Sequence, residues 1–151
     1  MVDEVIEVDV EIKSPADKFF MLIRQSQHVS KATQYIEGCD LLEGELDKVG
    51  SIVLWKLVFD GEPRMSKDRI ETMDLEKKVI QWRVLEGPLK REYKSFLKTM
   101  KVNPKQEGPG SVVKWNVKYV RIDENVPHPE GILQFLLEVT KEFDRYLLSE
   151  E

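Results

Sequence analysis

The C-terminal part of the chain has the hydrophobic period of a long helix, whereas most of what precedes it has the period of β-strands. Ile132, Leu136, Val139, Phe143 and Leu147 recur every three to four residues after His128-Pro129-Glu130, which is typical of one apolar helical face. An antiparallel sheet with one apolar face must have that face covered. This helix is the only large element available to cover it, so the sheet must fold around one helix.

Seven segments predict strands. Apolar and polar side chains alternate in Val5–Ile12 and Val113–Tyr119, as in strands with one buried face. Glycine, proline and aspartate mark the turns between the other runs. These five expected strands are Ile36–Glu45, Ser51–Phe59, Met65–Met73, Val79–Leu85 and Tyr93–Val102.

Two short helices are expected between the first and second strands. Ser14 and Pro15 have the residue types of an N-cap and a first helical position, and Asp17 follows near the positive helix end. His28–Ala32 is the second predicted helix.

The predicted fold class is therefore α+β, with a curved seven-stranded antiparallel sheet wrapped around the long helix (a helix-grip) in one domain, residues 1–151. A sheet curled around a single helix has few side chains to fill its open end, so we expect an internal cavity. A dry apolar void of ~300 Å³ at ~24 cal/mol per Å³ would cost about 7 kcal/mol. Since domain stability is roughly 5–15 kcal/mol, the space should be partly polar and hydrated, or occupied.

Composition narrows the function. The chain has 23 Lys and Arg against 28 Asp and Glu, a net charge of −5, which argues against nucleic acid or an anionic membrane as partner. No apolar run approaches the ~18 residues of a membrane span. One cysteine and an acidic, alternating N-terminus unlike a signal peptide favour a cytoplasmic protein. The oligomeric state is left open between monomer and weak dimer.

No motif predicts a metal, a cofactor or a catalytic nucleophile. The two histidines, His28 and His128, lie in no metal-ligand cluster. Cys39 lies inside a strand pattern, where a small buried side chain is the ordinary interpretation. Glu45–Gly50 has one glycine and several acids, which makes it a poor phosphate cradle.

These elements resemble the major latex protein/ripening-related family of plants, a branch of the Bet v 1-like (START-like) superfamily, over almost the whole chain. Each matching string is weak alone, but together they are specific. They are Val10–Lys13 with Ser14–Phe19, His28–Thr33, IEGCDLLEGE at Ile36–Glu45, VGSIVLW at Val49–Trp55, Asp60-Gly61, Glu86-Gly87, EYKSF at Glu92–Phe96, Gly108–Ser111 and Leu133-Gln134-Phe135.

The resemblance implies the helix-grip fold, a hydrophobic cavity and no metal or redox cofactor. It also implies binding of lipids, steroids or plant secondary metabolites, in association with defence and stress responses. Two features depart from the superfamily pattern. Leu46–Gly50 stands where the pollen-allergen branch has a glycine-rich loop, which weakens any transfer of ribonuclease or nucleotide-binding activity. The N-terminus is shorter and more acidic than the usual family start.

The functional hypothesis is a carrier of small hydrophobic ligands. Apolar positions of the predicted inner faces give the expected cavity lining, and turns near the long helix give its entrance. The lining residues are Val8, Val10, Trp82, Val84, Phe96, Trp115, Val117, Leu136 and Val139, and the entrance residues are Gly61, Glu62, Pro63, Gly87, Pro88 and Leu89.

Two alternatives remain open at this stage. Lys67 and Arg69 either form a solvated face with mutual ion pairs or, with Tyr93, point inward as polar anchors for a ligand head group. The second alternative is an enzyme catalysing a cyclisation or an isomerisation, for which Tyr35, Lys67, Tyr93 and Tyr119 are the acid–base candidates.

Overall fold

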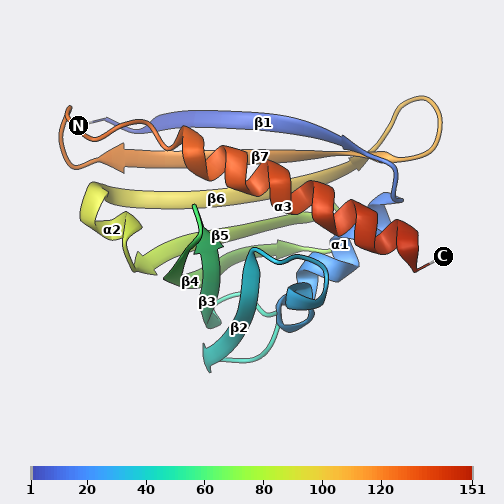
Figure 1. The fold of residues 1–151 in the computed structure, drawn as a ribbon, viewed down its shortest axis with the longest axis horizontal. Helices are drawn as coiled ribbons and strands as arrows, with labels where there is room; N and C mark the ends of the chain where they lie inside the picture. Colours follow the sequence, from blue (N-terminus) through green and yellow to red (C-terminus); the bar gives the residue numbers. More distant parts are fainter. Residues whose placement is uncertain (1, 151) are drawn as a thin grey trace.

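A computed structural model describes residues 2–150; Met1 and Glu151, the ends of the predicted domain, lie outside the described residues. Seven antiparallel strands form one sheet in the order β1-β7-β6-β5-β4-β3-β2, and the sheet curls around one long helix (Figure 1). The predicted fold class is therefore confirmed. The strands are β1 (Glu4–Ile12), β2 (Ile36–Glu43), β3 (Ile52–Phe59), β4 (Glu62–Asp74), β5 (Val79–Glu86), β6 (Tyr93–Pro104) and β7 (Ser111–Arg121).

The long helix α3 (Glu130–Ser149) crosses the inner face of the sheet diagonally (Figure 1). Its buried side chains are Leu136, Val139, Thr140 and Phe143, and three of these belong to the apolar face that the sequence predicts. Thr140 is the exception, because its hydroxyl accepts a hydrogen bond from Trp115 Nε1 at 2.8 Å and donates to the Leu136 carbonyl at 2.7 Å. Within the described residues, no helix is long and apolar enough to cross a membrane.

Two short helices, α1 (Ala16–Arg24) and η1 (Ser26–Lys31), lie between β1 and β2 as predicted. The prediction that Ser14 is the N-cap of α1 is wrong. Pro15 is the flanking residue, and no side chain caps the helix. Ser14 is buried and directs its hydroxyl to Asp144 of α3 instead. A further short helix, α2 (Leu89–Glu92), follows Gly87-Pro88 after the end of β5.

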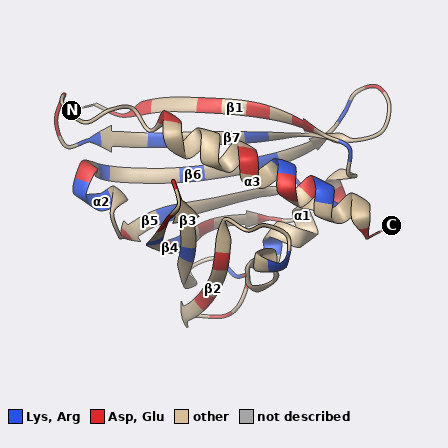
Figure 2. Ribbon diagram, in the orientation of Figure 1, with Lys and Arg blue, Asp and Glu red and all other residues tan. Residues whose placement is uncertain are grey.

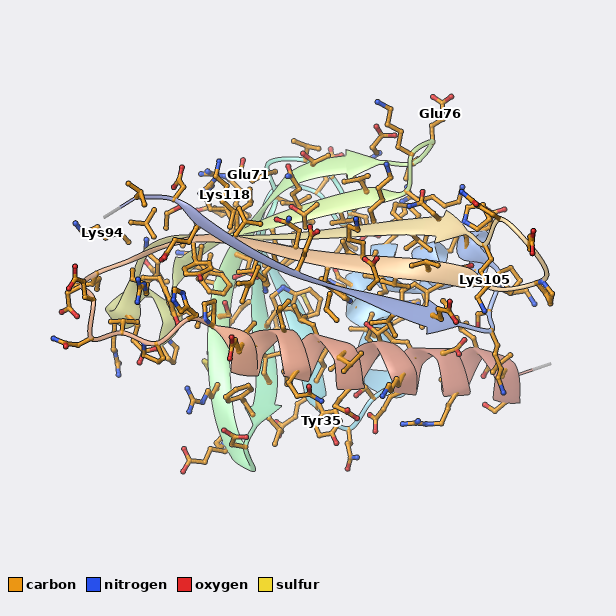
Figure 3. All side chains as sticks on the ribbon, turned by 90° about the horizontal axis from the view of Figure 1, so that it is seen from above. Tyr35, Glu71, Glu76, Lys94, Lys105 and Lys118 are labelled. Carbon is orange, nitrogen blue, oxygen red and sulfur yellow. The ribbon has the colours of Figure 1, made fainter. Side chains whose placement is uncertain are left out.

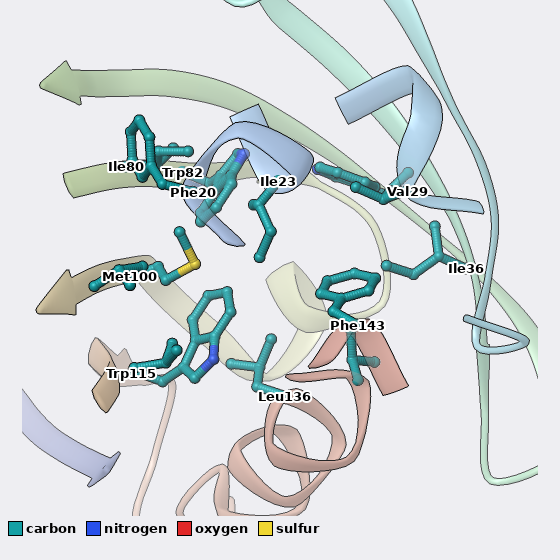
Figure 4. Packing of buried hydrophobic residues seen from close by; sticks show 14 of the residues in the cluster. Phe20, Ile23, Val29, Ile36, Ile80, Trp82, Met100, Trp115, Leu136 and Phe143 are labelled. Atoms are coloured by element: carbon teal, nitrogen blue, oxygen red, sulfur yellow. The ribbon is translucent and has the colours of Figure 1, made fainter. Parts of the chain in front are cut away.

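Charged side chains lie mainly on the outside. Acidic residues alternate along β1 (Figure 2), and Glu71 and Lys118 project from the side of the sheet away from α3 (Figure 3). Apolar side chains from the strands, α1, η1 and α3 pack together on the inner side, Trp82, Trp115 and Leu136 among them (Figure 4). The concave face of the sheet is thus the apolar one.

The turn between β2 and β3 is tied to the sheet. Gly50 has a φ of 89°, a left-handed conformation that favours glycine. Its N–H donates to the Ile70 carbonyl at 2.8 Å, and the Ile70 N–H donates to the Ser51 carbonyl at 3.0 Å. This turn is therefore an anchored connection between strands.

Asp144 connects the C-terminal half of α3 to the corner between β1 and α1. Its carboxylate accepts hydrogen bonds from the Lys13 N–H at 3.0 Å, the Ser14 N–H at 2.9 Å and the Ser14 hydroxyl. Ser14 is 1% exposed, so water cannot readily replace its two bonds if the carboxylate is removed, whereas the Lys13 bond is exposed.

We predict that Asp144→Ala lowers the free energy of unfolding by about 2–4 kcal/mol, because buried donors lose a charged acceptor. Urea denaturation measures the change. The matched control is Lys141→Ala, an exposed position on the same helix, which should change stability by less than about 0.5 kcal/mol. Equal effects of the two substitutions would show that the Asp144 junction does not hold the helix in place.

Candidate functional site

A cavity of about 60 Å³ lies between α3 and the sheet. Its walls come from α1, η1, five of the strands and α3, and all of its lining side chains except one lysine are apolar. They are Ile23, Val29, Ile36, Trp55, Leu57, Trp82, Lys98, Trp115, Phe135, Leu136, Val139 and Phe143. All three tryptophans of the chain are among them.

A second chamber of about 60 Å³ lies under the first turns of α3. Its lining includes Phe59 of β3, Met65 of β4 and, beside them, Pro88 and Leu89 at the start of α2. The two chambers share four lining residues, Leu57, Lys98, Phe135 and Leu136. They are therefore adjacent compartments of one interior.

The expected lining residues divide into two groups. One group lines the first chamber and consists of Trp82, Trp115, Leu136 and Val139. The other five do not line either chamber: Val8 is half-buried, and Val10, Val84, Phe96 and Val117 are buried in the packed core. The strand contacts of α3 are mainly with β1 and β7, so side chains there pack directly against the helix or its neighbours. The space opens farther along the sheet, towards β3.

The expected entrance residues also divide. Pro88 and Leu89 line the second chamber, and Gly61 lines a surface groove between the β3–β4 turn and α3. Glu62, Pro63 and Gly87 line none of these spaces. Gly87 has a structural reason to be glycine, because a Cβ there would approach the Met65 carbonyl oxygen to 2.7 Å.

Phe135 stands where the three spaces meet, since it lines both chambers and the surface groove. Its ring centroid lies 5.7 Å from that of Phe59 and 6.1 Å from that of Tyr35. The three rings therefore lie together beside the chambers and the groove.

The hypothesis of inward-pointing Lys67 and Arg69 is wrong. Ser66, Asp68 and Ile70 are the buried residues of this part of β4, so the residues between them face outward. Lys67 pairs with Glu86 at 3.7 Å, and Arg69 pairs with Glu71 at 2.9 Å. Strand alternation puts Lys67 and Arg69 on the solvated face, as the simpler interpretation has it.

Tyr93 is not a cavity anchor either. It is 2% exposed, and its hydroxyl donates to the Pro127 carbonyl at 2.7 Å. Burial, followed by the neighbouring Glu92 charge, raises the pKa of Tyr93 to about 12. The ring packs edge-on against Tyr119, whose hydroxyl is hydrogen-bonded to His128 Nδ1.

The acid–base candidates therefore do not converge in the cavity. Tyr93 and Tyr119 pack edge-on against each other without a shared hydrogen bond. Lys67 faces outward, and Tyr35 lines only the surface groove. No group of three or more His, Cys, Asp or Glu side chains within residues 2–150 could hold a metal ion.

The charged group inside the cavity is a different one. Lys98 of β6 lines both chambers, and its Nζ lies 2.9 Å from Asp68 Oδ2. Asp68 is fully buried, and its other oxygen accepts a hydrogen bond from the Ser66 hydroxyl at 2.7 Å. The sequence does contain a sign of the lysine's position. Lys98 lies two residues from both Phe96 and Met100, so it shares the apolar face of its strand with them.

A concave sheet, one covering helix and an apolar cavity between them define a helix-grip protein. A sequence model of the pathogenesis-related protein Bet v 1 family matches residues 1–150. MLP-like protein 165 of Arabidopsis thaliana is 73% identical over the full length of both chains. The crystal structure of ginseng major latex-like protein 151 superposes with a TM-score of 0.91 at 35% identity, covering 97% of this chain and 98% of that one.

The chain therefore belongs to the Bet v 1 family, and its close relatives place it among the major latex proteins. Proteins of this family generally bind small ligands. Norcoclaurine synthase from Thalictrum flavum, in complex with dopamine and hydroxybenzaldehyde, is similar at 18% identity with a TM-score of 0.73, covering 99% of this chain and 89% of that one. That likeness concerns the fold alone.

We predict that Lys98→Met lowers the free energy of unfolding by about 3–5 kcal/mol, because it leaves the Asp68 carboxylate buried without a counter-charge. Asp68→Asn combined with Lys98→Met should recover most of that loss. A double-mutant cycle by urea denaturation tests this. Lys118→Met is the control, since Lys118 pairs with Asp3 on the exposed outer face and should matter little. Additive losses at positions 68 and 98 would contradict the pairing.

Cys39 should be unreactive in the folded protein. It is 6% exposed, and burial is the main cause that raises the pKa of its thiol from 9.0 to about 12. Since the thiolate is the nucleophile, native alkylation by iodoacetamide at pH 8 should be about a thousandfold slower than in urea, as three pKa units imply. Because the folded state disfavours the thiolate, stability should also fall as the pH rises above 9.0. Equal native and unfolded rates would contradict this.

Proposed function

We propose that this protein binds and carries small hydrophobic molecules in the cavity under α3. The observation that supports the proposal is a cavity under α3 with eleven apolar lining side chains and one lysine. Ligand sites are usually concave, mostly apolar and equipped with few polar groups. The lipids, steroids or secondary metabolites that the family resemblance implies belong to this chemical class.

The size of the cavity limits how binding occurs. Each chamber holds about 60 Å³, whereas an engineered apolar cavity of about 150 Å³ is what accommodates benzene. A ligand of that size or larger must therefore join the chambers, and Phe135 is the side chain common to both and to the surface groove. We propose that Phe135, with Phe59 and Tyr35, closes the entrance.

Affinity should be modest and specificity low. A ligand of ~20 non-hydrogen atoms at about −0.3 kcal/mol each gains only ~−6 kcal/mol, which corresponds to tens of micromolar. An apolar lining with few hydrogen-bonding groups distinguishes poorly between ligands of similar size and shape. These properties suit a carrier that binds several related molecules.

The cellular setting is part of the proposal. We place the protein in the cytoplasm, because its single cysteine cannot form an internal disulfide, and in the defence or stress responses that the resemblance implies. The enzymatic alternative is less favoured, because the tyrosines and lysine considered for it lie outside both chambers.

We predict that Val139→Phe abolishes saturable binding of naphthalene, because Val139 is 2% exposed and lines the first chamber, so a ring there fills the ligand space. Binding is measured by the emission of the three tryptophans, all of which line that chamber. Val5→Phe is the matched control. Val5 is 54% exposed on β1, and its substitution should leave the affinity unchanged.

Two results would count against the carrier function. One is the absence of saturable binding of naphthalene and of larger apolar probes to the wild-type protein. The other is a Val139→Phe protein that is less stable, as overpacked cores are, but binds as well as the wild type.

A further inference from the structure

The polar groups of the cavity wall are hydrogen-bond donors. Lys98 Nζ carries three N–H bonds, and within residues 2–150 its one recorded partner is Asp68. Trp55 lines the same chamber and is 7% exposed, and its indole Nε1 is buried without a hydrogen-bond partner in the described chain. A buried donor without an acceptor is costly to leave unpaired.

The acceptors around the cavity are already engaged. Asp68 receives the Ser66 hydroxyl on one oxygen and Lys98 on the other. Thr140 accepts from the Trp115 indole N–H, and its own hydroxyl donates to the Leu136 carbonyl. Asp68 and Thr140 thus each already have a donor partner, whereas Trp55 Nε1 has no acceptor.

The strand order places Lys98 and Trp55, the residues that carry the two donors, on opposite sides of Trp82. Lys98 of β6 is paired with Trp82 of β5, and the Trp55 and Trp82 ring centroids lie 6.5 Å apart. Trp55 is also paired with Ser66 of β4, the residue that hydrogen-bonds Asp68. A ligand lying against the Trp82 ring therefore has a donor on each flank.

We propose that the bound molecule is a neutral, mainly apolar compound that carries a carbonyl oxygen, which accepts hydrogen bonds from Trp55 Nε1 and Lys98 Nζ. The inference rests on the proposed function and names the ligand class of that same cavity. A carboxylate would bring a second anion beside the buried Asp68, and an amine would bring a second cation beside Lys98. Both charges would lose hydration in an apolar interior.

The test uses two probes of nearly the same shape. Acetophenone has a carbonyl group, and α-methylstyrene has a methylene group in its place. The measured quantity is the preference, the dissociation constant of α-methylstyrene divided by that of acetophenone. Tryptophan emission gives both constants on the full-length protein, and 1-phenylethylamine serves as the cationic probe.

Trp55→Phe keeps an aromatic ring and removes the N–H. It should reduce the preference by about threefold to tenfold, the contribution of one buried hydrogen bond. Asp68→Leu with Lys98→Met removes the second donor without leaving a lone buried charge or adding a new N–H, and it should reduce the preference similarly. Val5→Phe is the control, because Val5 is 54% exposed on β1 and lines neither chamber, so its substitution should leave the preference unchanged.

A spectroscopic measurement on the wild-type protein keeps the test independent of whether the variants fold. The Trp55 indole N–H resonance, assigned by its loss in Trp55→Phe or by sequential NMR, should move downfield with acetophenone and stay in place with α-methylstyrene. The Trp115 indole resonance should respond alike to both probes.

Each outcome bears on one claim. Binding of both probes with a preference unaffected by either donor variant, or tighter binding of 1-phenylethylamine than of acetophenone, overturns the carbonyl assignment and leaves the carrier function standing. A wild-type protein that binds neither these probes nor larger apolar compounds overturns the carrier function, and the carbonyl assignment with it.

Discussion

One helix has to cover the concave face of a seven-stranded sheet, and the side-chain hydrogen bonds that tie α3 to the rest of the fold come from its C-terminal half, at Thr140, Glu142 and Asp144. Towards the C-terminus, the Asp144 carboxylate accepts hydrogen bonds from the backbone N–H groups of Lys13 and Ser14. Glu142 accepts hydrogen bonds from Thr33 and Gln34. In the segment that leads into α3, the Pro127 carbonyl accepts a hydrogen bond from the Tyr93 hydroxyl. The middle of the helix presents Phe135, Leu136 and Val139 to the interior. A helix fixed in this way can span a space that its own side chains do not fill.

Aromatic side chains keep that space small. The Trp82 and Trp115 rings are stacked at 5.9 Å, and Trp55 meets Trp82 edge-on. A void of about 60 Å³ costs about 1.4 kcal/mol at ~24 cal/mol per Å³, well below the cost of the ~300 Å³ void considered from the sequence. The unliganded fold can therefore be stable. A ligand larger than the void has to displace side chains, and Phe135 is placed to move because it already borders the surface groove.

The sequence predicts the fold better than the site, for a physical reason. Period-two and period-3.6 patterns report which face of an element is apolar, so the sheet and α3 were predictable. They do not report which apolar positions touch the helix and which border a gap, so Val117 and Trp115 of one strand look equivalent, although only Trp115 lines the cavity. The inward face of β4 is predicted wrongly because Lys67 and Arg69 share a face with the apolar Met65 and Met73. The buried face of this part of the strand instead carries Asp68 and Ile70. Ser14 was misassigned because its partner, Asp144, is 130 residues away.

The buried Asp68–Lys98 pair is the feature that packing alone explains least. Replacing a buried ion pair with apolar residues of similar volume is often neutral or stabilising, so stability does not account for two charges in an otherwise apolar interior. The pair is electrically neutral, and Asp68 is fully buried while the lysine side chain is 14% exposed. It therefore presents donors to the cavity without presenting net charge. The Lys98 ammonium and the Trp55 N–H are two directional hydrogen-bond donors in an otherwise apolar interior. A neutral oxygen acceptor on the ligand is the group that can form hydrogen bonds with them.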